Sequence, residues 1–266
     1  MSRLKSDLGW LEPAIDLPAA EHSSAIRKYL FSPLRVDFLI ECELLLQTFS
    51  IGIQDAICYP DFRCFASNQT GNSVMFAVAV SGVGGDLFDI HNVSMSLGMF
   101  VAGALITGQI AHVFGTRQRL WLIVAHLLQT IMVFGAAAIQ YAHGVQLNSP
   151  RTLGAIALLA FSSGAQVASM RPFRIQEITT AMATAAWVDL VIDKDLVALR
   201  NRSRNRRAAF LVVLVAGSFA GAFMRERIGS PSALVIAALC KTVVLLAFFL
   251  NRAQSAHEGD VGAGNS

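Results

Sequence analysis

The sequence predicts an all-α fold, a polytopic bundle of transmembrane helices, and two observations carry this prediction. Of the 266 residues, 54% are hydrophobic and only 15% are charged, whereas a soluble domain carries about 25% charged residues. The hydrophobic residues also form long runs: residues 93–114, 120–140 and 208–224 contain no Asp, Glu, Lys or Arg. A helix needs about 20 apolar residues to cross the hydrocarbon core of a bilayer. We therefore expect an integral, multi-pass membrane protein whose main partner is the lipid bilayer.

Eight apolar segments follow one another along the chain. Six have the length of a membrane span, whereas the second and the sixth are shorter and more polar. Each of these two follows a connection that contains a proline, Pro60 or Pro172. We predict six long spans and two short or re-entrant helices, an arrangement typical of transporters. The segments lie near residues 36–58, 70–84, 91–114, 120–142, 152–170, 177–192, 208–225 and 231–250.

The positions of Lys and Arg favour six spans over eight. With six spans and a cytosolic N-terminus, most basic residues lie on the cytosolic side, as the positive-inside rule expects. Eight spans would move Arg117, Arg119, Arg171 and Arg174 to the outside. The basic run from Arg200 to Arg207 is cytosolic in both arrangements, so it does not discriminate between them.

The chain divides into three regions. Residues 1–34 mix both charges and lack the basic start and apolar centre of a signal peptide, so we expect a cytosolic N-terminal tail. Residues 35–250 form the predicted transmembrane domain. Residues 251–266 are small and polar, and we expect a disordered C-terminal tail.

The transmembrane domain carries the pattern of an internal two-fold repeat. Residues 49–60 (FSIGIQDAICYP) and 161–172 (FSSGAQVASMRP) are identical at six of twelve positions, at an offset of 112. We therefore divide the domain into halves at about residues 36–142 and 152–250. The alternative is a coincidence among small residues that are common in membrane helices.

Polar residues gather where the first long span ends, and Asp55 is the most costly of them. A carboxylate inside hydrocarbon must be hydrated, paired or protonated. One hypothesis makes Asp55 a proton or cation site that faces a cavity. The other places it at the interface, where it accepts hydrogen bonds from the start of the next helix.

The run Asn68-Gln69-Thr70-Gly71-Asn72 opens the first short segment. Asn and Thr can cap the free backbone N–H groups of a helix start. A helix that starts inside the membrane also directs those groups at a polar or anionic solute. Both hypotheses, capping and a solute site, are kept for Asn68, Thr70 and Asn72.

The second half offers matching candidates. Gln166 aligns with Gln54 in the repeat, Thr184 lies opposite Thr70 after a two-residue shift, and Asp189 interrupts an apolar run. Glu177, near the start of the sixth segment, is most simply a partner for the dipole of that helix. The predicted solute or ion pathway therefore comprises Gln54, Asp55, Asn68, Thr70, Asn72, Gln166, Thr184 and Asp189.

Several classes of function have no support in the sequence. There is no nucleotide-binding, metalloprotease or hydrolase motif, so we expect neither an enzyme nor a cofactor or metal site. The net charge of +3 follows from topology or anionic lipid and does not indicate nucleic-acid binding. Small residues four apart, such as Gly98/Ala102 and Gly217/Gly221, favour close helix packing within the bundle, with a homo-oligomer face as the alternative.

Particular motifs resemble the YoaK-type family of multi-spanning membrane proteins, which carries a domain of unknown function. The resemblance covers about residues 36–250 and rests on G-x-x-D-A (52–56), T-G-N (70–72) and G-x-Q-x-A (164–168), followed by Thr180 to Thr184 and Asp189-Leu190. Ala185 and Ala186 depart from the Gly, Ser or Thr that is common there, which weakens a binding role at these two positions. The tail and QEITT (176–180) suggest a fungal member.

The leading functional prediction is a secondary transporter or permease for a small polar or anionic solute, with Asp55 as the proton or cation site. The repeat, the two short segments and the polar residues at their starts motivate it. The alternative is a non-transporting membrane scaffold or lipid-interacting protein, which the basic run from Arg200 to Arg207 motivates.

Overall fold

The structure, a computed structural model, describes residues 18–83, 87–147 and 149–254. Throughout these ranges the regular elements are helices, and no strand is present beyond isolated bridges. The helices are α1 (Pro18–Leu30), α2 (Phe38–Phe62), α3 (Gln69–Val80), α4 (Ile90–Phe114), α5 (Arg119–His143), α6 (Pro150–Met170), the 3-10 helix η2 (Arg171–Phe173), α7 (Thr184–Val191), α8 (Arg202–Ile228) and α9 (Ser230–Ala247).

Five of the described helices are long and apolar enough to cross a membrane: α4, α5, α6 continued by η2, α8 and α9. The all-helical membrane fold that the sequence predicts is therefore confirmed. Helix α2 has 25 residues as well, but it is more polar because it carries Glu41, Glu43, Asp55 and Asp61. The two short segments form α3, with 12 residues, and α7, with 8.

Polar caps and glycines set the limits of the long helices. The Asp37 carboxylate accepts from the backbone N–H groups of Leu39 and Ile40 at the start of α2, and Asp89 does the same for α4. Such caps satisfy N–H groups that have no partner within the helix. Glycines with positive φ end α4, α5 and α8, at Gly115, Gly144 and Gly229, where other residues would be strained.

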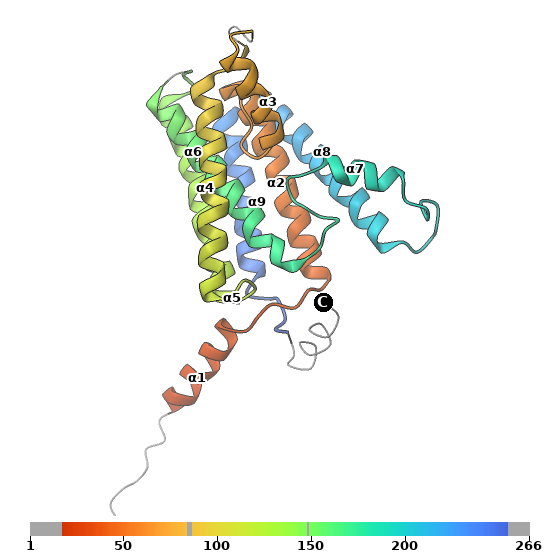
Figure 1. Cartoon of the computed structure of the whole chain (residues 1–266). Coiled ribbons are helices and arrows are strands. Elements are labelled where there is room, and N and C mark those ends of the chain that lie inside the picture. Colours follow the sequence, from red (N-terminus) through yellow and green to blue (C-terminus); the bar gives the residue numbers. More distant parts are fainter. Residues whose placement is uncertain (1–17, 84–86, 148, 255–266) are drawn as a thin grey trace, which may run out of the picture.

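The long helices pack in a spatial order that differs from their order in the chain. Helix α4 packs on α6, α6 on α5, α5 on α9, α9 on α2, and α2 on α8. Figure 1 shows these helices as one bundle, with α7 and the start of α8 extending to one side and α1 projecting from the end of the bundle where α9 ends. Short α3 packs on α4, and short α7 packs on α8.

Glycines bring two helix pairs into backbone contact. A Cβ added to Gly164 of α6 would lie 2.1 Å from the Phe100 carbonyl oxygen of α4, and one added to Gly52 of α2 would lie 2.6 Å from the Leu214 carbonyl oxygen of α8. The facing glycines behave alike: an added Cβ would lie 2.3 Å from the Phe161 oxygen at Gly103 and 2.4 Å from the Phe49 oxygen at Gly217. Because no side chain fits, these seams depend on glycine.

Not all of the small residues serve internal packing. A Cβ added to Gly98 or Gly108 of α4 would meet nothing within 4 Å. The expected internal role therefore holds for Gly103 and Gly217. The homo-oligomer alternative stays a prediction for Gly98 and Gly108.

The segments that flank the predicted transmembrane domain are joined to each other by backbone hydrogen bonds. Gln254 N–H donates to the Pro33 carbonyl at 2.8 Å, and Arg35 N–H donates to the Arg252 carbonyl at 3.0 Å. Order therefore continues for four residues into the region expected to be disordered, while residues 255–266 lie outside the described residues. The N-terminal region contains α1, and the Arg119 guanidinium lies 3.8 Å from the centre of its Tyr29 ring.

Candidate functional site

The break between α2 and α3 is held together by Asn72. This side chain is fully buried, and its Oδ1 accepts from the Phe65 N–H at 2.9 Å. Its Nδ2 donates to the Phe65 carbonyl at 2.8 Å and to Ser96 Oγ of α4 at 3.0 Å. Asn72 thus fixes the connection and ties it to α4.

Asp55 is bound to the same connection. Its Oδ1 accepts from the backbone N–H groups of Ala66 and Ser67, both at 2.9 Å, and its Oδ2 accepts from Ser67 Oγ. Both carboxylate oxygens therefore have protein donors. This geometry favours the second hypothesis, in which Asp55 accepts hydrogen bonds from the residues that lead into the next helix.

The starts of the two short helices meet at one cavity. Asn68 caps α3 by accepting from the Gly71 N–H at 3.1 Å, whereas no side chain caps the start of α7 at Thr184. A cavity of about 440 Å³ lies between them, on the side of the bundle where Figure 1 shows α7 beside α8. Its lining is Gly52, Asp55, Phe65, Asn68, Thr70, Ala181, Met182, Ala183, Thr184, Ala185, Leu214 and Ser218. Four of the predicted pathway residues, Asp55, Asn68, Thr70 and Thr184, thus belong to one site.

Gln54 and Gln166 lie inside the bundle and outside the lining of this cavity. Both side chains are fully buried. Gln54 Nε2 donates within α2 to the Ser50 carbonyl at 3.2 Å, and Gln166 Oε1 accepts from the Lys241 ammonium group of α9. The sequence considerations passed over Lys241, although a lone cation in the middle of an uncharged run is the signal of a functional group in a membrane helix.

Asp189 belongs to neither group. It is exposed on α7, with its Oδ2 at 3.8 Å from Arg207 Nε. Arg207 Nη1 lies 3.3 Å from the carboxylate of Asp193. Asp189 therefore takes part in a charge cluster at the start of α8, away from the cavity lining.

The expected role of Glu177 is wrong, because α7 begins only at Thr184. Glu177 lies in the irregular segment before it, where it accepts from Ser203 Oγ at 2.7 Å and approaches Arg206 at 3.6 Å. Arg206 also pairs with Glu41 of α2 at 2.7 Å. Glu177 therefore connects the segment before α7 to the start of α8.

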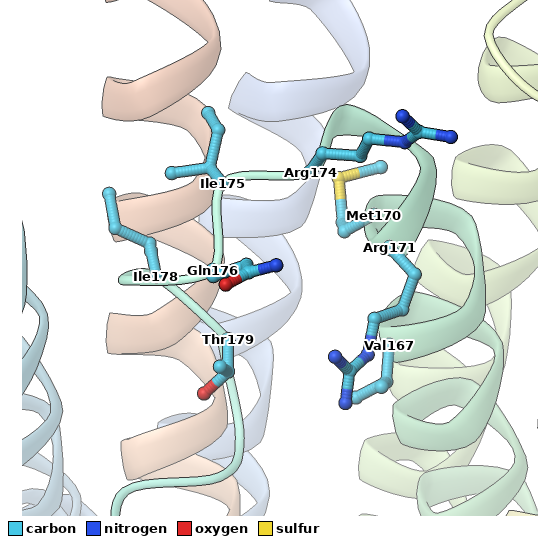
Figure 2. A pocket seen from close by; sticks show the side chains of 8 residues that line it. All are labelled: Val167, Met170, Arg171, Arg174, Ile175, Gln176, Ile178 and Thr179. Carbon is cyan, nitrogen blue, oxygen red and sulfur yellow. The ribbon is translucent and has the colours of Figure 1, made fainter. Parts of the chain in front are cut away.

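A second connection, between α6 and α7, carries arginines but encloses no room for a solute. Figure 2 shows Arg171 and Arg174 beside a small pocket, with their guanidinium groups pointing away from each other. Its volume is about 30 Å³, which suits a water molecule. Burial and the neighbouring charge of Arg174 lower the pKa of Arg117, whose Nε donates to the Pro172 carbonyl at 2.9 Å.

An ion pair at the far end of α2 was also missed. Arg225 Nε of α8 donates to Asp61 Oδ1 at 2.7 Å, and Gln140 Nε2 of α5 lies 3.4 Å from Asp61 Oδ2. The first apolar segment of the sequence ends near residue 58, whereas α2 continues through Pro60 to Phe62 and so includes Asp61. Over the described ranges, no group of three His, Cys, Asp or Glu side chains could hold a metal ion.

The comparisons with known proteins support a family and leave its activity open. The family model described as "Protein of unknown function (DUF1275)" matches residues 44–247, from α2 to the end of α9. Neither the comparison with curated proteins nor that with solved structures found a match. The match does not bear on the fungal origin, which stays a prediction. Because the family model covers most of the bundle, including both short helices, the chain belongs to the DUF1275 family of proteins of unknown function.

Proposed function

We propose that the protein is a secondary transporter or permease for a small polar or anionic solute, which binds in the cavity between the starts of α3 and α7. One observation carries the proposal: polar residues of both short helices line a single cavity of about 440 Å³. Discontinuous helices that begin at a shared site inside a membrane bundle are typical of secondary transporters.

The chemistry of the lining supports a polar or anionic solute. Helix starts direct free N–H groups and the positive end of the helix dipole outward. The start of α7 has no capping side chain, and the exposed residues Thr70 and Thr184 add hydroxyl groups. The Asp55 oxygens are bound to Ala66 and Ser67, so Asp55 chiefly holds the start of α3 in place.

The proposal includes α2 as a sixth span. Ion pairs with α8 lie at both ends of this polar helix, Glu41 with Arg206 and Asp61 with Arg225. Paired charges of this kind lower the cost of placing carboxylates near a membrane. Six crossings would put the ends of the chain, the α4–α5 turn and the start of α8 on the same side, in keeping with the distribution of Lys and Arg.

The proposal also includes the internal repeat, and the glycine seams support it. Gly52 and Gly164 are equivalent in the repeat, and each faces a backbone carbonyl of the second long helix of the other half. Gly52 of α2 faces α8, and Gly164 of α6 faces α4. Phe49 and Phe161 are equivalent as well, and their carbonyls face Gly217 and Gly103. The equivalent helices of the two halves are α2 and α6, α4 and α8, and α5 and α9. Exchanging each pair in the spatial order α4–α6–α5–α9–α2–α8 gives the same order read backwards.

The two helix breaks supply a second support for the repeat. Arg63 and Arg174 each follow a buried phenylalanine and adopt left-handed backbone conformations, with φ of 57° and 56°. Such a conformation is uncommon outside glycine. Its recurrence at corresponding breaks is what a duplicated fold would produce.

The second candidate function is a membrane scaffold or lipid-interacting protein. A groove of about 580 Å³ beside the starts of α2 and α8 is lined in part by Arg200, Arg202 and Arg206, which suits an anionic headgroup. Glu41 already pairs with Arg202 and Arg206, so the transporter is preferred. Anionic-lipid binding that disappears when Arg200 and Arg202 are neutralised would favour this second function.

An untargeted metabolite comparison tests the transporter and identifies its solute. Cells with and without the protein should differ in a small polar or anionic metabolite. Thr184→Phe should abolish the difference, because the ring would remove the hydroxyl group and block the start of α7 in the cavity lining. Leu239→Phe is the matched control, since Leu239 is exposed on α9 outside the cavity lining, and it should leave the difference unchanged.

The proposal fails if Thr184→Phe, expressed at the wild-type level, preserves the metabolite difference. It also fails if purified wild-type protein in liposomes does not move the metabolite that the comparison identifies.

A further inference from the structure

Lys241 is a fully buried cation in the bundle without an acidic partner among the residues that the structure describes. It lies in α9, whose other residues are uncharged, and its exposed fraction is 0%. Its ammonium group donates to Gln166 Oε1 of α6 and lies 3.4 Å from Gln129 Oε1 of α5. Both acceptors are neutral amide oxygens. Since buried charges are normally paired, the positive charge of Lys241 is poorly compensated.

The titratable groups of the surrounding helices leave one neighbour for Lys241. That neighbour is His126 of α5, on whose ring the charge of Lys241 acts. Residues 152–170 of α6 and 208–224 of α8 contain no titratable side chain. The charged residues of α2 and α5 have other partners: Glu41 with Arg206, Glu43 with Asn251, Asp55 with Ser67, Asp61 with Arg225, and Arg119 with the carbonyls of Phe249 and Asn251. The remaining titratable side chains of α2, α5 and α9 are the thiols of Cys42, Cys58 and Cys240, the phenols of Tyr59 and Tyr141, and the His143 ring.

His126 of α5 carries a buried ring nitrogen, Nε2, that is free to accept a proton. Its Nδ1 lies 3.0 Å from the Leu122 carbonyl oxygen, which can only accept, so Nδ1 carries the hydrogen of the neutral ring. Nε2 therefore keeps its lone pair, and it is buried without a partner among the described residues. Nε2 of Gln166, whose Oε1 accepts from Lys241, is also buried without a partner among the described residues. Unpaired polar atoms of this kind are costly in a purely structural network.

We propose that Lys241 is a proton-binding site in the bundle, which releases and rebinds one proton as the protein changes conformation. The N–H bond of the ammonium group breaks, its electron pair stays on Nζ, and the proton passes to a water molecule that enters as the conformation changes, since no hydrogen bond joins Nζ to His126 Nε2 here. A proton from water later restores the ammonium group. The proposal rests on the proposed function in one respect: coupled to solute movement, Lys241 makes the protein a proton-coupled transporter.

Charge displacement after a pH jump tests the site without any solute. Full-length protein in liposomes is adsorbed on a solid-supported membrane, and the transient charge that follows a pH step is recorded. Wild-type protein should give a displaced charge, and Lys241→Met should lower it by at least about fivefold, because Met fills a similar volume without binding a proton. Lys194→Met is the matched control, since Lys194 is exposed in the α7–α8 connection, and it should keep the wild-type signal.

Lys241→Arg provides a second variant should the Met variant unfold, as judged by gel filtration and thermal unfolding. Arginine keeps the positive charge but does not release its proton in proteins, so the displaced charge should also be lost. A full displaced charge in either folded variant, or none in the wild type, would overturn the proposal. Displaced charge without solute flux would refute transport and leave the proton site standing. Solute flux without displaced charge would refute the proton site and leave transport standing.

Discussion

Asp55 of α2 and Lys241 of α9 are both ionisable side chains inside the bundle, and their hydrogen bonds differ in kind. Asp55 accepts from two backbone N–H groups and a hydroxyl group, so its charge is compensated by the protein. Lys241 donates to amide oxygens alone. At the residue scale, Asp55 is therefore an anchor for the start of α3, and Lys241 is the group whose charge must change or be matched during function.

Asp55→Asn should leave the protein folded and able to transport. Asn Oδ1 can still accept from Ala66 and Ser67, and its Nδ2 can donate to Ser67 Oγ, so the expected loss of stability is about 1 kcal/mol. Asp55→Ala removes every acceptor and should cost roughly 2–3 kcal/mol. Thermal unfolding in detergent measures both losses. If the Asp55→Asn variant is folded but has lost all solute flux, Asp55 is instead the proton or cation site.

At the scale of elements, the bundle depends on seams where helices touch backbone to backbone. Gly103 and Gly164 join α4 to α6, and Gly52 and Gly217 join α2 to α8. Apolar side chains give helices no preference for each other over lipid, so close backbone packing supplies the association energy. In the α2–α8 pair, ion pairs at both ends reinforce the seam.

Two glycines of α4 give a matched test of the seam. Gly103→Ala would place its Cβ 2.3 Å from the Phe161 carbonyl oxygen, whereas Gly98→Ala would meet nothing within 4 Å. We expect Gly103→Ala to destabilise the protein by about 1–3 kcal/mol through overpacking. Gly98→Ala should be neutral, or stabilising by up to about 1 kcal/mol through helix propensity. Equal unfolding temperatures for the two variants would contradict the seam.

At the scale of the whole molecule, the connections matter as much as the spans. The α2–α3 and α6–α7 connections return the chain to one cavity, so residues more than a hundred positions apart, such as Thr70 and Thr184, line the same space. Figure 1 shows that α7 and the start of α8 stand apart from α4, α5 and α6. The cavity therefore lies at the α2–α8 side of the bundle.

The parts of this architecture that depend on local composition could be predicted from the sequence. Uncharged runs mark the long helices, and the polar stretch from Asn68 to Asn72 marks the start of α3, because spanning and capping both need particular residues in one place. Contacts between side chains that are distant in the sequence could not be predicted in the same way. Glu177 reaches Ser203 and Arg206 across an irregular segment, and no local pattern encodes that contact.

Lys241 shows the other limit of sequence considerations. Its position in an uncharged run was visible, but whether it faced lipid, a carboxylate or amides depended on how α9 packs against α5 and α6. The sequence likewise could not show that Gln54 and Gln166 lie outside the cavity lining. The rotation of each helix about its axis decides which polar side chains face the same space.

Thiol accessibility at Thr184 tests the central claim, a water-accessible polar cavity at the starts of two broken helices, most directly. Thr184→Cys and Leu239→Cys are placed in a background without the native cysteines and exposed to a charged, membrane-impermeant thiol reagent in sealed vesicles of both orientations. Only an ionised thiol reacts, and ionisation requires water. Cys at position 184 should therefore react at least about tenfold faster than Cys at position 239 from one side of the membrane. Equal and slow reaction of both from either side would show that no such cavity exists.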